Sequence, residues 1–97
     1  MTPVTISQTG VGNSAAKKVD TFIAPFNIGF GVVVTGTVTY TIQHSFDGTD
    51  WFNHPDVAAE TANADGNYAL PVQYLRVSVT AGTGTAAMTY IQAGVNP

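Results

Sequence analysis

Apolar and polar residues alternate along most of this chain with the two-residue period that is typical of β-strands. The clearest strand signal covers residues 26–34. Its predicted inward face consists of Phe26, Ile28, Phe30, Val32 and Val34. The opposite face carries Gly29 and Gly31, which leave a strip without side chains. Such a strip either accepts another backbone or a bulky side chain, or marks a bulge or a twisted edge.

The same alternation predicts further short strands. Residues 38–44 alternate apolar side chains with threonine, residues 68–70 form a short strand that ends before Pro71, and residues 85–93 form the last strand. In residues 74–80, Leu75, Val77 and Val79 are predicted to point inward and Tyr74, Arg76 and Ser78 outward. Short glycine turns at 35–37 and 81–84 predict two β-hairpins.

The predicted fold is all-β, a small antiparallel β-sandwich or jelly-roll-like barrel of about six to eight strands in one domain, residues 1–97. Thr, Val, Ile and the aromatic residues make up 41 of 97 residues, and no helical period is present. Residues 9–16 are expected to be a flexible connection, and residues 56–67 a polar loop that is mobile or contacts a partner. Residues 1–16 are then either the first strand of the domain or an arm that adds a strand to a neighbour through Val4 and Ile6.

Charge and composition narrow the classes of partner. Charged residues make up 9% of the chain, against roughly 25% in an average protein, and the net charge is −3 with only three cations. We therefore expect no nucleic-acid partner, and a surface that is partly covered by other subunits. No apolar run is long enough to span a membrane, so we expect no membrane partner. The N-terminus lacks the features of a signal peptide, so we expect no secretory export. Cysteine is absent, which excludes disulfides.

Two histidines provide the main candidates for metal binding or acid–base chemistry. His44 and His54 lie on either side of an Asp-Gly turn, with Asp47 and Asp50 nearby. No third ligand with suitable spacing follows, and His44 occupies an ordinary position in an alternating strand. No serine has the context of a hydrolase nucleophile. We expect no catalytic site, no metal and no cofactor.

The most distinctive segment runs from Ser45 to Trp51 and reads SFDGTDW. It is similar to the Asp-Gly-x-x-Trp turns of sialidase-type Asp boxes and of discoidin-like sugar-binding sandwiches. In one interpretation Asp47 caps a hairpin turn and Trp51 packs at its base. In the other, Trp51 and Asp47 form a site on which a sugar ring stacks.

Arg76 is the only arginine, and it is predicted on the outer side of a strand. It either pairs with a carboxylate such as Asp20 or Glu60, or anchors a subunit interface. Tyr74 and Tyr90 are predicted at the surface, where they are further candidates for interface contacts.

Most of the chain, residues 25–94, resembles a group of small proteins encoded among the virion genes of tailed bacteriophages. The resemblance is carried by Gly36 and Thr37, Tyr40–His44, Asp47, Trp51, Pro71–Arg76 and Gly84–Gly94. It implies a non-enzymatic capsid decoration or cement protein that binds the major capsid protein and copies of itself, as a dimer or trimer. The expected location is the capsid surface, after assembly in the host cytoplasm. Two alternatives are a tail, neck or fibre-associated subunit and a carbohydrate-binding adhesion module on the virion.

Overall fold

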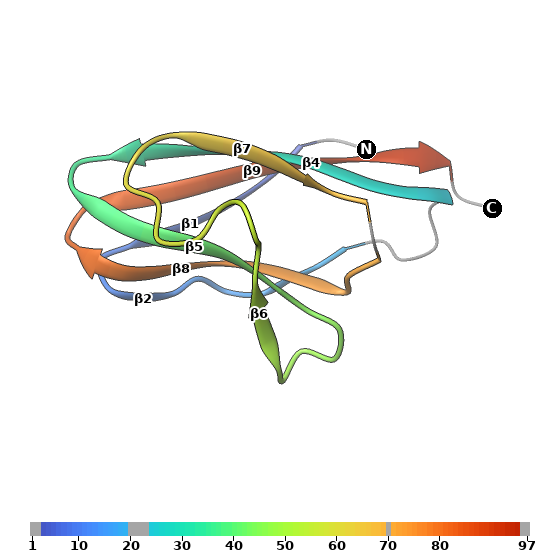
Figure 1. The fold of residues 1–97 in the computed structure, drawn as a ribbon, viewed down its shortest axis with the longest axis horizontal. Coiled ribbons are helices and arrows are strands. Elements are labelled where there is room, and N and C mark those ends of the chain that lie inside the picture. The colour runs from blue at the N-terminus through green and yellow to red at the C-terminus, as the bar shows by residue number, and fades with distance from the viewer. Residues whose placement is uncertain (1–2, 20–23, 70, 96–97) are drawn as a thin grey trace.

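The computed structural model describes residues 3–19, 24–69 and 71–95. The described chain forms two antiparallel sheets that pack face to face as a β-sandwich and do not close into a barrel (Figure 1). The all-β prediction is therefore confirmed, and of its two architectures the sandwich is the one observed. The strands are β1 (Val4–Thr9), β2 (Gly12–Asn13), β3 (Lys17–Lys18), β4 (Ala24–Thr35), β5 (Val38–Ser45), β6 (Trp51–Asn53), β7 (Ala64–Tyr68), β8 (Tyr74–Gly82) and β9 (Thr85–Val95).

The first sheet has four strands in the order β1-β9-β4-β7. β4 lies at its centre and pairs along most of its length with β9, from Asn27 opposite Ala93 to Thr35 opposite Thr85. On its other side β4 pairs with β7, from Ile28 opposite Tyr68 to Val32 opposite Ala64. The long pairing explains why the residues 26–34 gave the strongest strand pattern.

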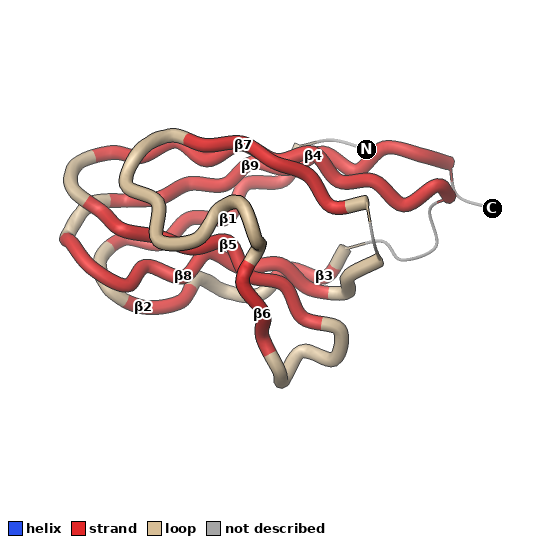
Figure 2. The backbone as a smooth tube through the Cα atoms, in the orientation of Figure 1, coloured by secondary structure: helices blue, strands red, loops and turns tan. Residues whose placement is uncertain are grey.

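The second sheet has the order β2-β8-β5-β6, and β3 also pairs with β8. Figure 2 shows that β2 and β3 are short strand segments in an otherwise irregular stretch that follows the edge of this sheet. β5 and β6 form a hairpin whose register runs from Gln43 opposite Asn53 to Ser45 opposite Trp51. In Figure 1 this hairpin extends away from the two layers of the sandwich.

Both hairpins predicted at the short glycine turns are wrong. The strands before and after residues 36–37 are β4 and β5, which lie in different sheets, and the same holds for β8 and β9 around residues 83–84. Each turn therefore carries the chain across the sandwich. The two turns lie side by side, because the N–H of Gly84 donates to the carbonyl of Thr37 at 2.8 Å.

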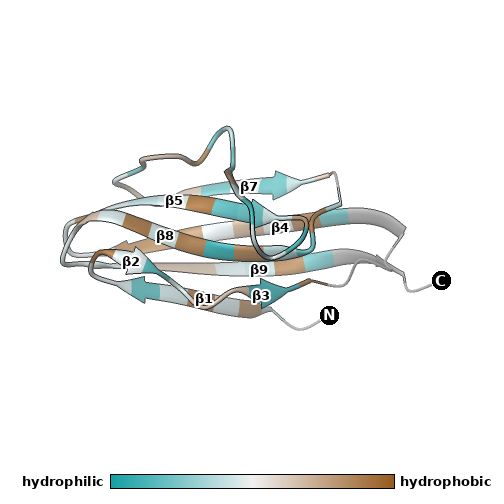
Figure 3. Ribbon diagram, turned by 90° about the horizontal axis from the view of Figure 1, so that it is seen from below, coloured by the Kyte–Doolittle hydropathy of each residue, from teal (hydrophilic) through white to brown (hydrophobic). Residues whose placement is uncertain are grey.

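The core lies between the sheets and follows the alternation in the sequence. Ile28, Phe30 and Val32 are buried as predicted, as are Leu75, Val77 and Val79. Phe26 belongs to the same predicted face, but its side chain falls outside the described ones. Figure 3 shows apolar segments alternating along β5 and β8, with hydrophilic residues concentrated on β3 and β7.

Three local predictions need correction. Residues 12–14 are not a free connection, because Gly12 and Asn13 pair with β8 and the buried Ser14 hydroxyl accepts a hydrogen bond from the N–H of Val77 at 2.9 Å. With the short segments β2 and β3, the described residues contain nine strands. The region 56–67 is not one polar loop, since Val57 is buried and β7 begins at Ala64. The short strand predicted at 68–70 thus ends at Tyr68, and Leu70 lies outside the described residues.

Candidate functional site

The turn of the β5–β6 hairpin is held by side chains that cap its backbone. One carboxylate oxygen of Asp47 accepts the N–H groups of Thr49 at 2.8 Å and Asp50 at 2.9 Å. The buried Ser45 hydroxyl accepts the N–H of Gly48 at 2.8 Å and donates to the Asp47 carboxylate at 3.1 Å. Gly48 has a φ of +83°, a conformation that favours glycine. The predicted capping of the turn by Asp47 is therefore confirmed.

The same hydrogen bonds fix the charge of Asp47. The N–H groups of Asp50 and Thr49, followed by the Ser45 hydroxyl, hold the pKa of the Asp47 carboxyl below its usual value. A carboxylate that accepts three hydrogen bonds at the surface is a stable anion and a poor proton donor. Asp47 thus serves the turn, and its geometry does not favour general acid catalysis.

Two phenylalanines next to this turn are unusually exposed. Phe46 is 51% exposed and Phe52 is 50% exposed, although both are large apolar side chains. Their ring centroids are 5.9 Å apart, and both rings contact His44. A hollow of about 360 Å³ lies beside Phe46 and is lined by Pro71, Val72 and Gln73. The hairpin therefore presents a connected aromatic surface to solvent, which is the feature expected of a protein-binding site.

Arg76 lies on the opposite face of this sheet from His44 and Phe52, and it is held in a row of side chains across three strands. Its Nε donates to the Gln43 side-chain oxygen at 2.7 Å, and the Gln43 amide donates to Asn53 at 2.9 Å. Its guanidinium lies 4.1 Å from the centroid of the Trp51 ring, within the range of a cation–π contact. One face of Trp51 is therefore covered by Arg76, which leaves less of the ring for stacking on a sugar.

Of the two carboxylates suggested as partners of Arg76, only Glu60 lies among the described residues. Asp20 lies outside the described residues. Glu60 pairs through its backbone with Tyr40 at the edge of β5. Arg76 is consequently an ordered, partly exposed cation that stacks on Trp51, a position compatible with the predicted interface anchor.

The two histidines belong to a buried aromatic cluster that joins the sheets. Their rings pack edge-on against Tyr68, at 5.0 Å from His44 and 4.9 Å from His54, and Phe30 completes the cluster. His44 Nδ1 lies 2.9 Å from the Tyr68 hydroxyl. Burial, and then the nearby His54, lower the pKa of His44, while burial raises the pKa of Tyr68.

His54 is fully engaged by the backbone. Its Nδ1 accepts the N–H of Asp56 at 3.1 Å, so its Nε2 carries the proton and donates to the carbonyl of Asn67 at 3.0 Å. Both ring nitrogens are therefore used, and neither is oriented as a metal ligand. Within residues 3–19, 24–69 and 71–95, no group of three or more His, Cys, Asp or Glu side chains is placed to hold a metal ion.

The remaining predicted interface residues differ in accessibility. Tyr90 is only 2% exposed and Ile6 4%, so both side chains lie in the core, and the surface position predicted for Tyr90 is wrong. Val4 packs against the core from β1, which pairs with β9 of its own sheet. Tyr74 is partly exposed and packs beside Gly48 of the hairpin turn. Of the five candidates, Tyr74 and Arg76 are therefore the two that lie next to the hairpin, on the face that carries Trp51 and opposite to His44 and Phe52.

Sequence reasoning missed Phe46 and Phe52 as site residues. Phe46 directly follows the last strand residue before the turn, and Phe52 directly follows Trp51, so both flank the motif that was singled out. Phe52 belongs to β6 and Phe46 directly follows β5, so both lie on the projecting hairpin. Only the three-dimensional arrangement shows that they lie together.

No protein-family model matches the chain, and comparison with curated proteins and with solved structures found no match. Across the described residues there is no helix that is long and apolar enough to cross a membrane. The fold defines the chain as a small β-sandwich protein. Its function has to be inferred from its residues and their geometry.

Proposed function

We propose that this protein is a non-enzymatic structural component of a tailed-bacteriophage virion, a decoration or cement protein that binds the major capsid protein and stabilises the head. The resemblance of residues 25–94 to small virion proteins motivates the proposal. The observation that supports it most directly is the projecting hairpin with the half-exposed Phe46 and Phe52. Arg76 and Tyr74, on the opposite face of the same sheet, are residue types that are enriched in interface hot spots.

A binding role explains why these side chains are kept at the surface. Exposed aromatic rings lower solubility in a free monomer, but at an interface each contributes a large buried apolar area. The capped turn holds the rings in place before binding, which reduces the entropy lost on association. The stack of Arg76 on Trp51 similarly orders the only arginine of the chain.

A small clamp of this kind stabilises a shell by mass action. A ligand that binds only the expanded shell favours that state, and many copies together stabilise it without large individual interfaces. Contacts between copies of the protein, as a dimer or trimer around a symmetry axis, would add to this effect. The low charge of the chain is compatible with a surface that is covered in the assembly.

The test is binding of the purified protein to shells assembled from the matching major capsid protein, with expanded and unexpanded particles compared by sedimentation. We expect saturable binding to expanded shells. The double variant Phe46→Ser/Phe52→Ser should weaken it about tenfold or more, as expected for loss of an aromatic hot spot. Val11→Ser is the matched control, because Val11 is 68% exposed in the turn after β1, away from the hairpin.

Two results would contradict the proposal. If neither type of shell binds the protein, a tail, neck or fibre-associated role becomes the better hypothesis. A glycan array that the protein labels, with loss of signal in Trp51→Ala, would instead favour the carbohydrate-binding module. A far-UV and thermal melting comparison of each variant shows whether the loss reflects binding rather than unfolding.

A further inference from the structure

Two glycines in the centre of the four-stranded sheet are not explained by the fold. Gly29 and Gly31 lie inside β4, and neither has the positive φ that favours glycine. A Cβ atom added at either position would meet no atom within 4 Å. Glycine in a strand interior weakens the strand, and it often marks a place where another molecule closely approaches the backbone.

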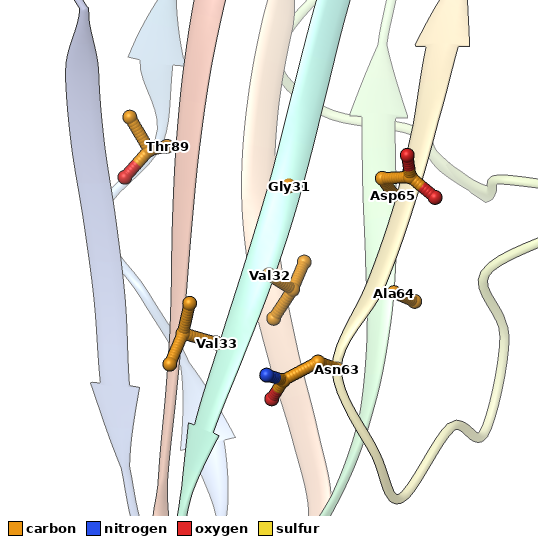
Figure 4. Close-up of a pocket in the computed structure, with 7 residues that line it drawn as sticks. All are labelled: Gly31, Val32, Val33, Asn63, Ala64, Asp65 and Thr89. Atoms are coloured by element: carbon orange, nitrogen blue, oxygen red, sulfur yellow. The ribbon is translucent and has the colours of Figure 1, made fainter.

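The neighbouring strands turn this bare strip into a trough. Gly31 pairs with Thr89 on β9 and with Asp65 on β7, and Gly29 pairs with Ile91 and Asn67 on the same two strands. Figure 4 shows Gly31 without a side chain between Thr89 and Asp65. A hollow of about 510 Å³ lies over this point, on the outer face of the sheet.

The two sides of the trough differ in chemistry. Val33 is 59% exposed and Ile91 is 49% exposed, so the strip is bordered by accessible apolar side chains. On the β7 side, Asp65 supplies the only charge among the residues that line the hollow. Asn63 completes this wall and is held in place, since its side-chain oxygen accepts the N–H of Val34 at 2.8 Å.

We propose that the trough binds a basic side chain, lysine or arginine, from an extended segment of a partner protein. The apolar stem of such a side chain fits along the glycine backbone and Val33, and its charged end reaches the carboxylate of Asp65. The net charge of −3 on the chain favours the approach of a basic partner. Within one molecule the described cations lie elsewhere, because Lys17 and Lys18 belong to the other sheet and Arg76 stacks on Trp51.

This inference goes beyond the proposed function and uses different residues. The aromatic hairpin belongs to the second sheet, whereas the trough lies on the outer face of the first sheet. The molecule would thus carry two separate binding surfaces. A test of the trough with small peptides can succeed or fail whatever the outcome of the shell-binding experiment.

The experiment is a titration of the ¹⁵N-labelled full chain with the peptide acetyl-Ser-Arg-Ser-amide, followed by NMR chemical shifts. A parallel arm uses lysine in place of arginine, and a control peptide carries citrulline, which keeps the shape of arginine without its charge. We expect saturable shifts at the amides of Gly29, Gly31, Asp65 and Thr89. Affinity for the citrulline peptide should be about three- to fivefold weaker, the range of an exposed ion pair.

Variants separate the two parts of the site. Gly31→Val fills the trough and should abolish the saturable shifts, while Asp65→Asn should reduce affinity for the arginine peptide to that for the citrulline peptide. Asp50→Asn is the matched control, because Asp50 is an exposed acid on the hairpin, and it should leave the titration unchanged. Backbone spectra of each variant establish that it is folded.

Four results would overturn the proposal. The first two are equal affinities for the arginine and citrulline peptides, and unchanged peptide affinity in the Gly31→Val variant. The third is the absence of saturable shifts with either basic peptide. The fourth is a set of shifts at the trough amides that depends on protein concentration when no peptide is present. The last result would show that a second copy of this chain occupies the trough.

Discussion

Replacing Gly31 with alanine should stabilise the isolated protein. The added methyl group meets no atom within 4 Å and the φ of Gly31 is compatible with any residue, so the folded state gains no strain. The unfolded chain meanwhile loses conformational freedom, and alanine in a strand interior is favoured over glycine by about 0.5–1 kcal/mol. For a domain of this size the melting temperature should rise by about 2–8 °C.

Gly82→Ala is a matched substitution with the opposite expected sign. Gly82 has a φ of +94°, and an added Cβ would contact the carbonyl oxygen of Thr37 and lie 2.9 Å from Val38 Cα. The left-handed conformation alone is unfavourable for alanine by about 1–2 kcal/mol, and the backbone contact adds to this. Gly82→Ala should therefore lower the free energy of unfolding by more than Gly31→Ala raises it.

Urea denaturation of the wild type and both variants, followed by Trp51 fluorescence and by far-UV circular dichroism, measures these differences. A Gly31→Ala variant that is less stable than the wild type would refute the reasoning. It would mean that the fold itself requires glycine at this position, and the trough would lose its main support. A stabilised variant would show that Gly31 is kept for a reason outside the fold of the single chain.

Three further predictions concern the buried cluster, the first strand and Arg76. The pKa of His44 is lowered from 6.5 in the folded state, so the unfolded chain binds more protons than the folded chain just below this pH. The free energy of unfolding should therefore fall as the pH decreases from about 6.5. Urea midpoints measured at several pH values should show this fall in the wild type and much less of it in His44→Asn. His54 and Tyr68 are the titratable groups facing His44, and an unchanged slope would exclude His44 as its source. Ile6→Ala should lower the free energy of unfolding by about 2–5 kcal/mol, because the Ile6 side chain is only 4% exposed. A melting temperature equal to that of the wild type would instead indicate a detachable N-terminal arm. Arg76→Ala should remove the contact with Trp51, which is worth about 0.5–1 kcal/mol, and should change the Trp51 fluorescence. It should also weaken binding to shells. Shells that bind as much of the variant as of the wild type would disprove the role of Arg76 as an anchor.

The pattern of residues was sufficient to predict the long strands and much of the core, but not the short strands at 12–13, 17–18 and 51–53. A strand with one buried face must alternate with a period of two, so Ile28, Phe30 and Val32 are buried because they share a face. The Asp47 turn was also readable, because its capping hydrogen bonds join neighbours in the chain. Hydrogen bonds between residues that are close in the chain can therefore be predicted from the sequence.

The pairing of strands was decided by the tertiary structure. A short glycine turn is compatible with a hairpin or with a crossing between sheets, and the crossing at residues 36–37 depends on β9 and β7 occupying the two sides of β4. Tyr90 shows the same limit. The strand that contains it alternates, but which of its two faces is buried depends on the sheet that packs against it.

The two candidate binding surfaces were also predicted from the sequence only in part. The order of residues alone determined the outward position of Gly29 and Gly31, because alternation assigns every second residue to one face. Only the folded structure showed that Asp65 and Ile91 border that strip, and that Phe46 and Phe52 share an exposed hairpin. Residues far apart in the chain, such as Gly31 and Thr89, become neighbours through long-range pairing, and that pairing minimises the free energy of the whole chain rather than of any segment.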